Sequence, residues 1–223
     1  MKKLWLVVLA LLMVSVIGFS LDLSAGVKAG FNVSSYAGSD YRNYLEDWPA
    51  DNAIHLGFQF GGFATIGLLD FLAIEPEVLV AFLGDTFKED MKPYGYGGYA
   101  RYYDKLTYLE PAVLAKIRFG SFNVFAGPML MVRLGSGKTG TKADDDDLDD
   151  LIADEVDYED DVFKKMVFAV TGGGGSMVPV GPGDLLVEVR GQYSLQNMLN
   201  EDEYRFHNYS IMMMLGYSYS FRK

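Results

Sequence analysis

The C-terminal segment constrains the fold most, because residues 207–221 alternate strictly between two kinds of side chain. Successive side chains of a β-strand point to opposite sides. One side of this segment is apolar or aromatic: Tyr209, Ile211, Met213, Leu215, Tyr217, Tyr219 and Phe221. The other side carries Asn208, Ser210, Met212, Met214, Gly216, Ser218 and Ser220. Such a strand is typical of a barrel wall that separates lipid from an interior.

The N-terminus has the pattern of a secretory signal peptide. Lys2 and Lys3 precede an apolar run over residues 4–17, and the small residues Gly18 and Ser20 follow it. The run is shorter than the ~20 apolar residues that span a membrane, and no charged stop-transfer cluster follows. We expect a signal peptide at residues 1–20 and a mature domain at 21–223. The chain has no Cys, which excludes a disulfide framework and an anchor on an N-terminal Cys.

Eight segments with a period of two, bounded by turn residues, follow along the mature chain. They are residues 21–33, 54–68, 71–83, 106–118, 122–134, 162–178, 185–196 and 207–221. Short turns alternate with long connections, the long ones being 34–53, 84–105, 135–161 and 197–206. Outer-membrane barrels have short periplasmic turns and longer extracellular loops. The pattern predicts an all-β fold, an eight-stranded antiparallel up-and-down transmembrane β-barrel.

Charged residues lie in mid-segment, on the face opposite the apolar one. In segment 185–196, for example, Glu188 and Arg190 alternate with Leu185, Val187 and Val189. An Arg or Lys that faces lipid near the midplane costs about 2–4 kcal/mol, so we expect these charges inside. The predicted interior ion network is Lys28, Glu75, Glu77, Glu110, Lys116, Arg118, Glu188 and Arg190. Side chains fill an eight-stranded barrel, so the network should act as a plug. The open alternative is the solvated face of a soluble barrel.

Gly172 to Gly175 interrupt the sixth segment. Glycines inside a strand suggest a bend, a bulge or room for a bulky neighbour. A phosphate-binding loop is not expected there, because no Lys-Ser/Thr pair and helix follow. The stretch Gly135 to Thr139 resembles the end of such a loop, but its required first Gly is replaced by Val132. We expect an exposed turn at that position.

The net charge of −11 argues against a nucleic-acid partner. Twelve acidic residues lie between Asp144 and Asp161, in a predicted acidic extracellular loop at 135–161. Hard cations bind several carboxylates, so a divalent cation at Asp144, Asp145, Asp146 and Asp147 is the alternative interpretation. The calcium-loop spacing is missing, and we expect a solvated loop without a metal or cofactor. Four apolar residues at helical spacing suggest a short amphipathic helix over the barrel mouth: Leu148, Leu151, Ile152 and Val156.

The two histidines, His55 and His207, lie at predicted extracellular strand ends, near several serines and Asp51. Outer-membrane acyltransferases and proteases place a base and a nucleophile at such a rim. The period of two points His55 inward and His207 outward, and no third partner is apparent. We therefore expect no catalytic residues and no enzyme, with an outer-membrane acyltransferase or protease as the remote alternative.

Several short motifs resemble the outer-membrane β-barrel domain family of small porin-like proteins, the PorT-like group. They are GVKAGFN at 26–32, IEPEVL at 74–79, YLEPA at 108–112, KIRFG at 116–120, FAGP at 125–128 and GYSYSF at 216–221. The resemblance covers nearly the whole mature chain and implies a bacterial outer-membrane location. It also implies a transport or secretion role. Arg222 and Lys223 depart from the pattern, because a Phe usually ends such chains.

The sequence thus favours a non-enzymatic outer-membrane barrel with a plugged, charged interior and extracellular loops that bind a partner. Aromatic residues in the connections 36–48 and 94–103 support this reading. The alternative is a small-solute porin or a secretion-associated barrel. Expected partners are outer-membrane lipid and lipopolysaccharide, together with the barrel-assembly machinery during biogenesis. We expect a monomer.

Overall fold

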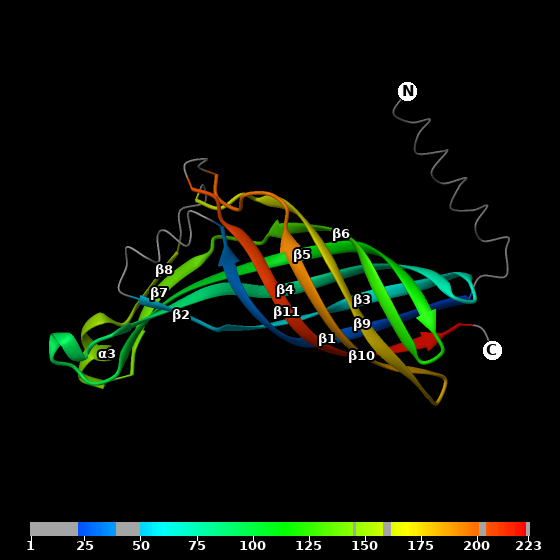
Figure 1. The fold of residues 1–223 in the computed structure, drawn as a ribbon, viewed down its shortest axis with the longest axis horizontal. Coiled ribbons are helices and arrows are strands. Elements are labelled where there is room, and N and C mark those ends of the chain that lie inside the picture. The colour runs from blue at the N-terminus through cyan, green and yellow to red at the C-terminus, as the bar shows by residue number, and fades with distance from the viewer. Residues whose placement is uncertain (1–21, 39–49, 145, 158–161, 201–203, 222–223) are drawn as a thin grey trace, which may run out of the picture.

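The computed structural model describes residues 22–38, 50–144, 146–157, 162–200 and 204–221. The predicted signal peptide at 1–20 lies outside these residues. Eight antiparallel strands form a ring, in the order β4-β3-β1-β11-β10-β9-β6-β5, and pairing of β4 with β5 closes it (Figure 1). Their bounds are β1 Asp22–Ala37, β3 His55–Leu69, β4 Leu72–Asp90, β5 Tyr99–Phe119, β6 Phe122–Arg133, β9 Met166–Val180, β10 Gly183–Ser194 and β11 His207–Ser220. The predicted eight-stranded barrel is confirmed.

The short turns lie at one end of the ring, which we call the short-turn end, and the long connections at the other, the long-connection end. Gly120 and Gly181 occupy short turns at φ 64°, a conformation that favours glycine because it has no Cβ. The described chain starts and finishes at the short-turn end (Figure 1). Within the described residues no helix is long and apolar enough to cross a membrane.

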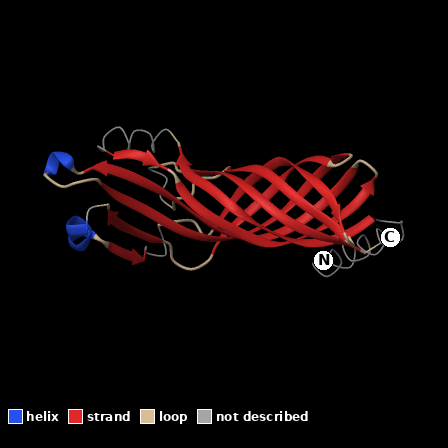
Figure 2. Cartoon of the chain, turned by 90° about the horizontal axis from the view of Figure 1, so that it is seen from below, coloured by secondary structure: helices blue, strands red, loops and turns tan. Residues whose placement is uncertain are grey.

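At the long-connection end, part of the wall continues past the ring as a projecting sheet (Figure 2). We define it as residues 84–90 of β4 and 99–105 of β5 with β2 (Ala50–Ala53), β7 (Lys138–Ala143) and β8 (Asp154–Asp157). The sheet ends in α3 (Asp146–Ile152) and the 3₁₀ turn η1 (Lys92–Tyr94). Much of the predicted connections 84–105 and 135–161 is therefore strand. The search for apolar residues with a period of two did not find these strands, because polar residues occupy both of their faces.

The outer face of the ring is apolar and the inner face is buried. Val27, Val113, Ile211 and Leu215 are all more than half exposed on the outside. Exposed aromatic residues lie toward both ends of this face. Those toward the long-connection end are Phe31, Phe58, Phe82, Phe168, Tyr193 and Tyr209, and those at the short-turn end are Phe71, Phe119, Phe122, Tyr219 and Phe221. Two aromatic girdles around an apolar band are typical of a wall that faces lipid.

Val113→Arg should lower the free energy of unfolding in a bilayer by about 2–4 kcal/mol, because a cation then lies in the middle of the apolar band. Thr107→Arg is the matched control, on the outer face of the same strand but at the edge of the band, and should cost about 0–1 kcal/mol. Denaturant titration in phospholipid vesicles, followed by heat-modifiable mobility on gels, measures both values. Equal losses would contradict a lipid-facing outer wall.

Candidate functional site

The lumen near the short-turn end contains an ion cluster of six buried side chains from four strands: Lys28, Glu75, Glu77, Lys116, Glu188 and Arg190. The Nζ atom of Lys28 lies 2.9 Å from Glu75, 2.7 Å from Glu77 and 3.2 Å from Glu188. Lys116 bridges Glu75 at 2.5 Å and Glu188 at 3.2 Å. Arg190 pairs with Glu77 at 2.6 Å and Glu188 at 2.5 Å. The three cations and three carboxylates balance in formal charge.

Neighbouring residues make room for this cluster and cover it. A Cβ on Gly173 of β9 would collide with Arg190, and one on Gly175 would press against Glu188. The glycines in segment six thus leave space for bulky inward neighbours, one of the readings that the sequence offered. The ring of Phe125 lies 4.9 Å from the guanidinium of Arg190 and 5.4 Å from Nζ of Lys116. Cations over aromatic faces are attracted to the ring quadrupole.

Glu110 and Arg118, predicted as members of the same network, form no ion pair with the six residues of the cluster. The carboxylate of Glu110 is buried and accepts a hydrogen bond from the amide of Gln192 at 3.1 Å. Within the described residues it forms no ion pair. Arg118 pairs instead with Asp22 at 3.0 Å, and that aspartate is 60% exposed at the short-turn end. The alternation along a strand shows which face a residue occupies. It does not show how far along the barrel axis the residue lies relative to charges on other strands.

Toward the long-connection end, the lumen fills with an apolar plug that the sequence analysis missed. Its inward-facing strand residues include Ala81, Leu83, Leu106, Tyr108, Met129, Met131, Val167 and Ala169. The end of β1 and two connections close over them, with the ring of Tyr36 stacked on Phe206 at 5.8 Å and tilted against Phe163 at 6.4 Å. The detectable signal was a strand with apolar residues on both faces, as in residues 80–83.

The acidic residues singled out in the sequence are spread over several elements. Asp144 pairs with Arg101 at 2.8 Å, Asp146 and Asp147 begin α3, and Asp145 lies outside the described residues. In the described part of the chain, no group of three or more His, Asp or Glu side chains could hold a metal ion. The predicted helix forms in part as α3, which ends at Ile152, whereas Val156 belongs to β8. The helix lies beside β7 at the tip of the projecting sheet instead of over the barrel mouth (Figure 1).

In the projecting sheet, the carboxylate of Glu155 of β8 accepts hydrogen bonds from two lysines and one tyrosine. Nζ of Lys105 donates to its carboxylate at 2.6 Å, Nζ of Lys138 at 3.0 Å and the hydroxyl of Tyr103 at 3.1 Å. These hydrogen bonds, with Lys105 the largest cause, lower the pKa of Glu155 to about 2. They tie β8 to β5 and β7.

The two histidines make structural contacts. His55 lines a hollow on the outer face, with Nδ1 3.2 Å from the hydroxyl of Thr86, and does not point inward as predicted. A β-bulge explains the difference, since residues 54–57 lie opposite only 83–85 between two paired positions. Nδ1 of His207 lies 2.9 Å from the carbonyl of Ser194, and its ring stacks on Tyr193 at 5.5 Å.

The chain matches a known family. The model of the outer membrane protein beta-barrel domain matches residues 18–200, most of the chain. No curated protein matches.

Solved barrels resemble the chain at low identity. Neisserial surface protein A is 12% identical, with a TM-score of 0.44, and covers 91% of this chain and 100% of its own. The attachment invasion locus protein Ail of Yersinia pestis, solved with the heparin analogue sucrose octasulfate, is 10% identical, with a TM-score of 0.41 and coverage of 89% and 99%. The outer membrane protease OmpT of Escherichia coli is 10% identical, with a TM-score of 0.36 and coverage of 90% and 96%.

Lys116→Met should lower the free energy of unfolding by about 3–5 kcal/mol, because it removes one cation from Glu75 and Glu188 and leaves the buried cluster with an uncompensated negative charge. Lys116→Met combined with Glu75→Gln restores the charge balance and should recover most of that loss. Denaturant unfolding of the refolded chain measures all variants.

Glu110→Gln is the matched control for that series, since it also replaces an ionisable side chain buried in the lumen. Glu110 accepts its hydrogen bond from a neutral amide, and a glutamine of the same shape can accept the same bond, so the replacement should change stability by less than about 1 kcal/mol. A loss as large as that of Lys116→Met would show that Glu110 belongs to the cluster after all.

The carboxyl of Glu155 should titrate with a midpoint near pH 2 in the folded chain. A carboxyl whose folded pKa is lowered stabilises the fold above its ordinary pKa, about 4.3, and that contribution is lost as pH falls toward 2. NMR titration of the side-chain carbon measures the midpoint. Lys105→Gln should raise it and Lys165→Gln should not; an unchanged midpoint in Lys105→Gln would refute the assigned cause.

Proposed function

Since the chain belongs to the outer membrane protein beta-barrel domain family and is a protein of the bacterial outer membrane, we propose that it acts there as a closed, non-enzymatic barrel. Its long-connection end faces the outside and binds a partner. The observation that supports this proposal most directly is that two groups of side chains fill the lumen, the ion cluster in one part and the apolar plug in another.

The two fillings resist a passing solute for different reasons. Moving one member of the ion cluster leaves its partners buried and unpaired, which is costly in a low-dielectric interior. Opening the apolar plug exposes packed side chains to water, at about 25 cal/mol for each Å². A small-solute porin or secretion-associated barrel would need both fillings to move in every transport event. This supports the closed barrel over transport.

The same end supplies a surface for a partner. The projecting sheet carries the wall beyond the apolar band, and its tip presents exposed aromatic residues such as Tyr94, Tyr96 and Tyr99. Functional residues gather on connections held by a rigid scaffold. The contacts of His55 with Thr86 and of His207 with a backbone carbonyl support a structural role for both histidines. We further propose that the chain is a monomer that contacts outer-membrane lipid and lipopolysaccharide, and the barrel-assembly machinery during biogenesis.

Residues 21–223, refolded into a planar bilayer, should show no steady conductance while the same sample shows a heat-modifiable gel shift. The shift confirms that the barrel has formed. Discrete openings that change in Lys116→Gln, but not in the outer-face control Val113→Ala, would overturn the proposal. They would make the lumen a gated pathway and favour the porin or secretion role.

A further inference from the structure

The outer face of the projecting sheet carries a cationic patch just above the apolar band. Lys88 of β4 lies opposite Arg101 of β5, and Arg101 lies opposite Lys142 of β7. Strand partners in register point to the same face, so three cations form one row. Lys105 and Lys138 form a second pair four residues closer to the ring. Like charges directly opposite each other destabilise a sheet, so an anion at this place would relieve repulsion.

The acidic residues nearby balance only part of this patch. Asp144 pairs with Arg101 at 2.8 Å, and Glu155 is shared between Lys105 at 2.6 Å and Lys138 at 3.0 Å. Asp51 of β2 is in register with Lys88, and Asp157 of β8 with Lys138. Among the described residues, Lys88 and Lys142 form no ion pair, although the Nζ atom of Lys88 lies 6.0 Å from the ring centroid of Tyr99. Two unpaired cations that flank a third are unusual in a chain with a net charge of −11.

A hollow of about 590 Å³ lies among these cations. Its lining includes Lys88, Arg101, Lys142, Thr86, Tyr103 and His55. Ammonium, guanidinium and hydroxyl groups that converge on one hollow are the donors that bind phosphate oxygens, and Arg can do so with two parallel hydrogen bonds. The β-bulge at 54–57 adds the His55 ring to this outer lining.

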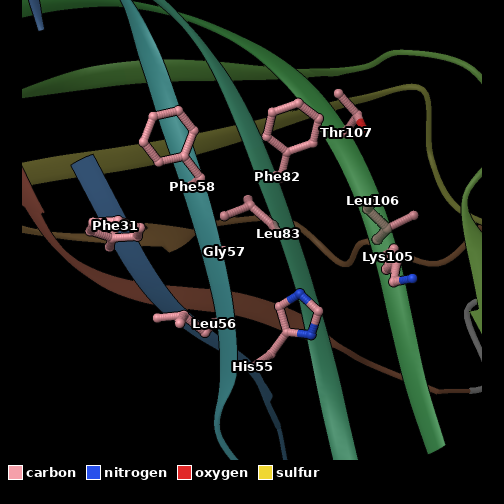
Figure 3. Close-up of a pocket in the computed structure, with 10 residues that line it drawn as sticks. All are labelled: Phe31, His55, Leu56, Gly57, Phe58, Phe82, Leu83, Lys105, Leu106 and Thr107. Carbon is pink, nitrogen blue, oxygen red and sulfur yellow. The ribbon is translucent and has the colours of Figure 1, made fainter. Parts of the chain in front are cut away.

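A second hollow has a volume of about 370 Å³ and shares His55 with the first; Figure 3 shows the residues that line it. Its outer lining is apolar and aromatic, with Phe31, Leu56, Phe58 and Phe82 around it. These side chains belong to the upper edge of the apolar band. A cationic hollow directly above an apolar one fits a molecule with an anionic head group and apolar chains attached to it.

We propose that the two hollows together hold one phosphorylated lipid of the outer leaflet, of the lipid A class, with a phosphate among Lys88, Arg101 and Lys142. The acyl chains lie against the aromatic hollow. A free phosphate would leave the aromatic hollow without an occupant, which favours the lipid. This site deepens the proposed function and rests on it for the orientation of the long-connection end.

The test is native mass spectrometry of the folded mature chain in detergent, with phosphorylated lipid A and the same lipid without its phosphates as probes. The phosphorylated lipid should bind roughly tenfold or more tightly than the dephosphorylated one, as expected for charge-assisted hydrogen bonds. Lys88→Gln with Lys142→Gln should remove that preference and leave the Arg101–Asp144 pair intact. Lys92→Gln with Lys165→Gln makes the same charge change elsewhere and should retain it.

Three outcomes would overturn the site. The two lipids bind equally, or both double variants lose binding equally, or inorganic phosphate displaces the lipid while Phe82→Ala has no effect. The last outcome would indicate an anion site without a lipid. Heat-modifiable mobility and conductance of the same samples separate the proposals: a folded, non-conducting native chain without lipid preference overturns the site alone.

Discussion

The charge balance of the ion cluster is the interaction on which the rest of the structure depends. A ring of eight strands leaves a lumen that side chains must fill, and charges placed there must find partners because isolated buried ions are expensive. Lys28, Lys116 and Arg190 meet three glutamates only when β1, β4, β5 and β10 are correctly registered and tilted. A slip of one residue on any strand would turn its charge toward lipid. The cluster thus fixes the register of the wall while it fills the lumen.

The lumen changes chemistry along its axis. The cluster fills the half near the short-turn end, and the apolar plug fills the half near the long-connection end, where Tyr36, Phe163 and Phe206 close over it. On β5, Glu110 lies between Tyr108 of the apolar plug and Lys116 of the ion cluster, and its partner is a neutral amide. The division has a physical reason. Charged side chains from four strands form ion pairs with one another in one half of the lumen. The connections contribute apolar side chains that exclude water from the other end.

The wall also changes chemistry along the same axis, on its outer side. Apolar residues on β5 give way after Thr107 to Lys105, Tyr103 and Arg101, on the same face of the same strand. One β-sheet therefore faces lipid in its lower part and polar surroundings above. The β-bulge at 54–57 turns His55 onto that outer face at the transition. The cationic patch, on β4, β5 and β7, and the aromatic edge, on β1, β3 and β4, lie on the two sides of this transition.

The sequence by itself determined the eight ring strands, their inner and outer faces and the residue types inside, because a period of two is a local property of each strand. Tertiary structure decided which inward charges meet. Glu110 and Arg118 have the correct phase but the wrong height, and height depends on strand tilt and register around the ring. It also decided the position of His55, since one extra residue in a bulge reverses the phase. The strands at 138–143 and 154–157 escaped prediction because polar residues cover both faces, and they form sheet because β7 pairs with β5 and β8 pairs with β7.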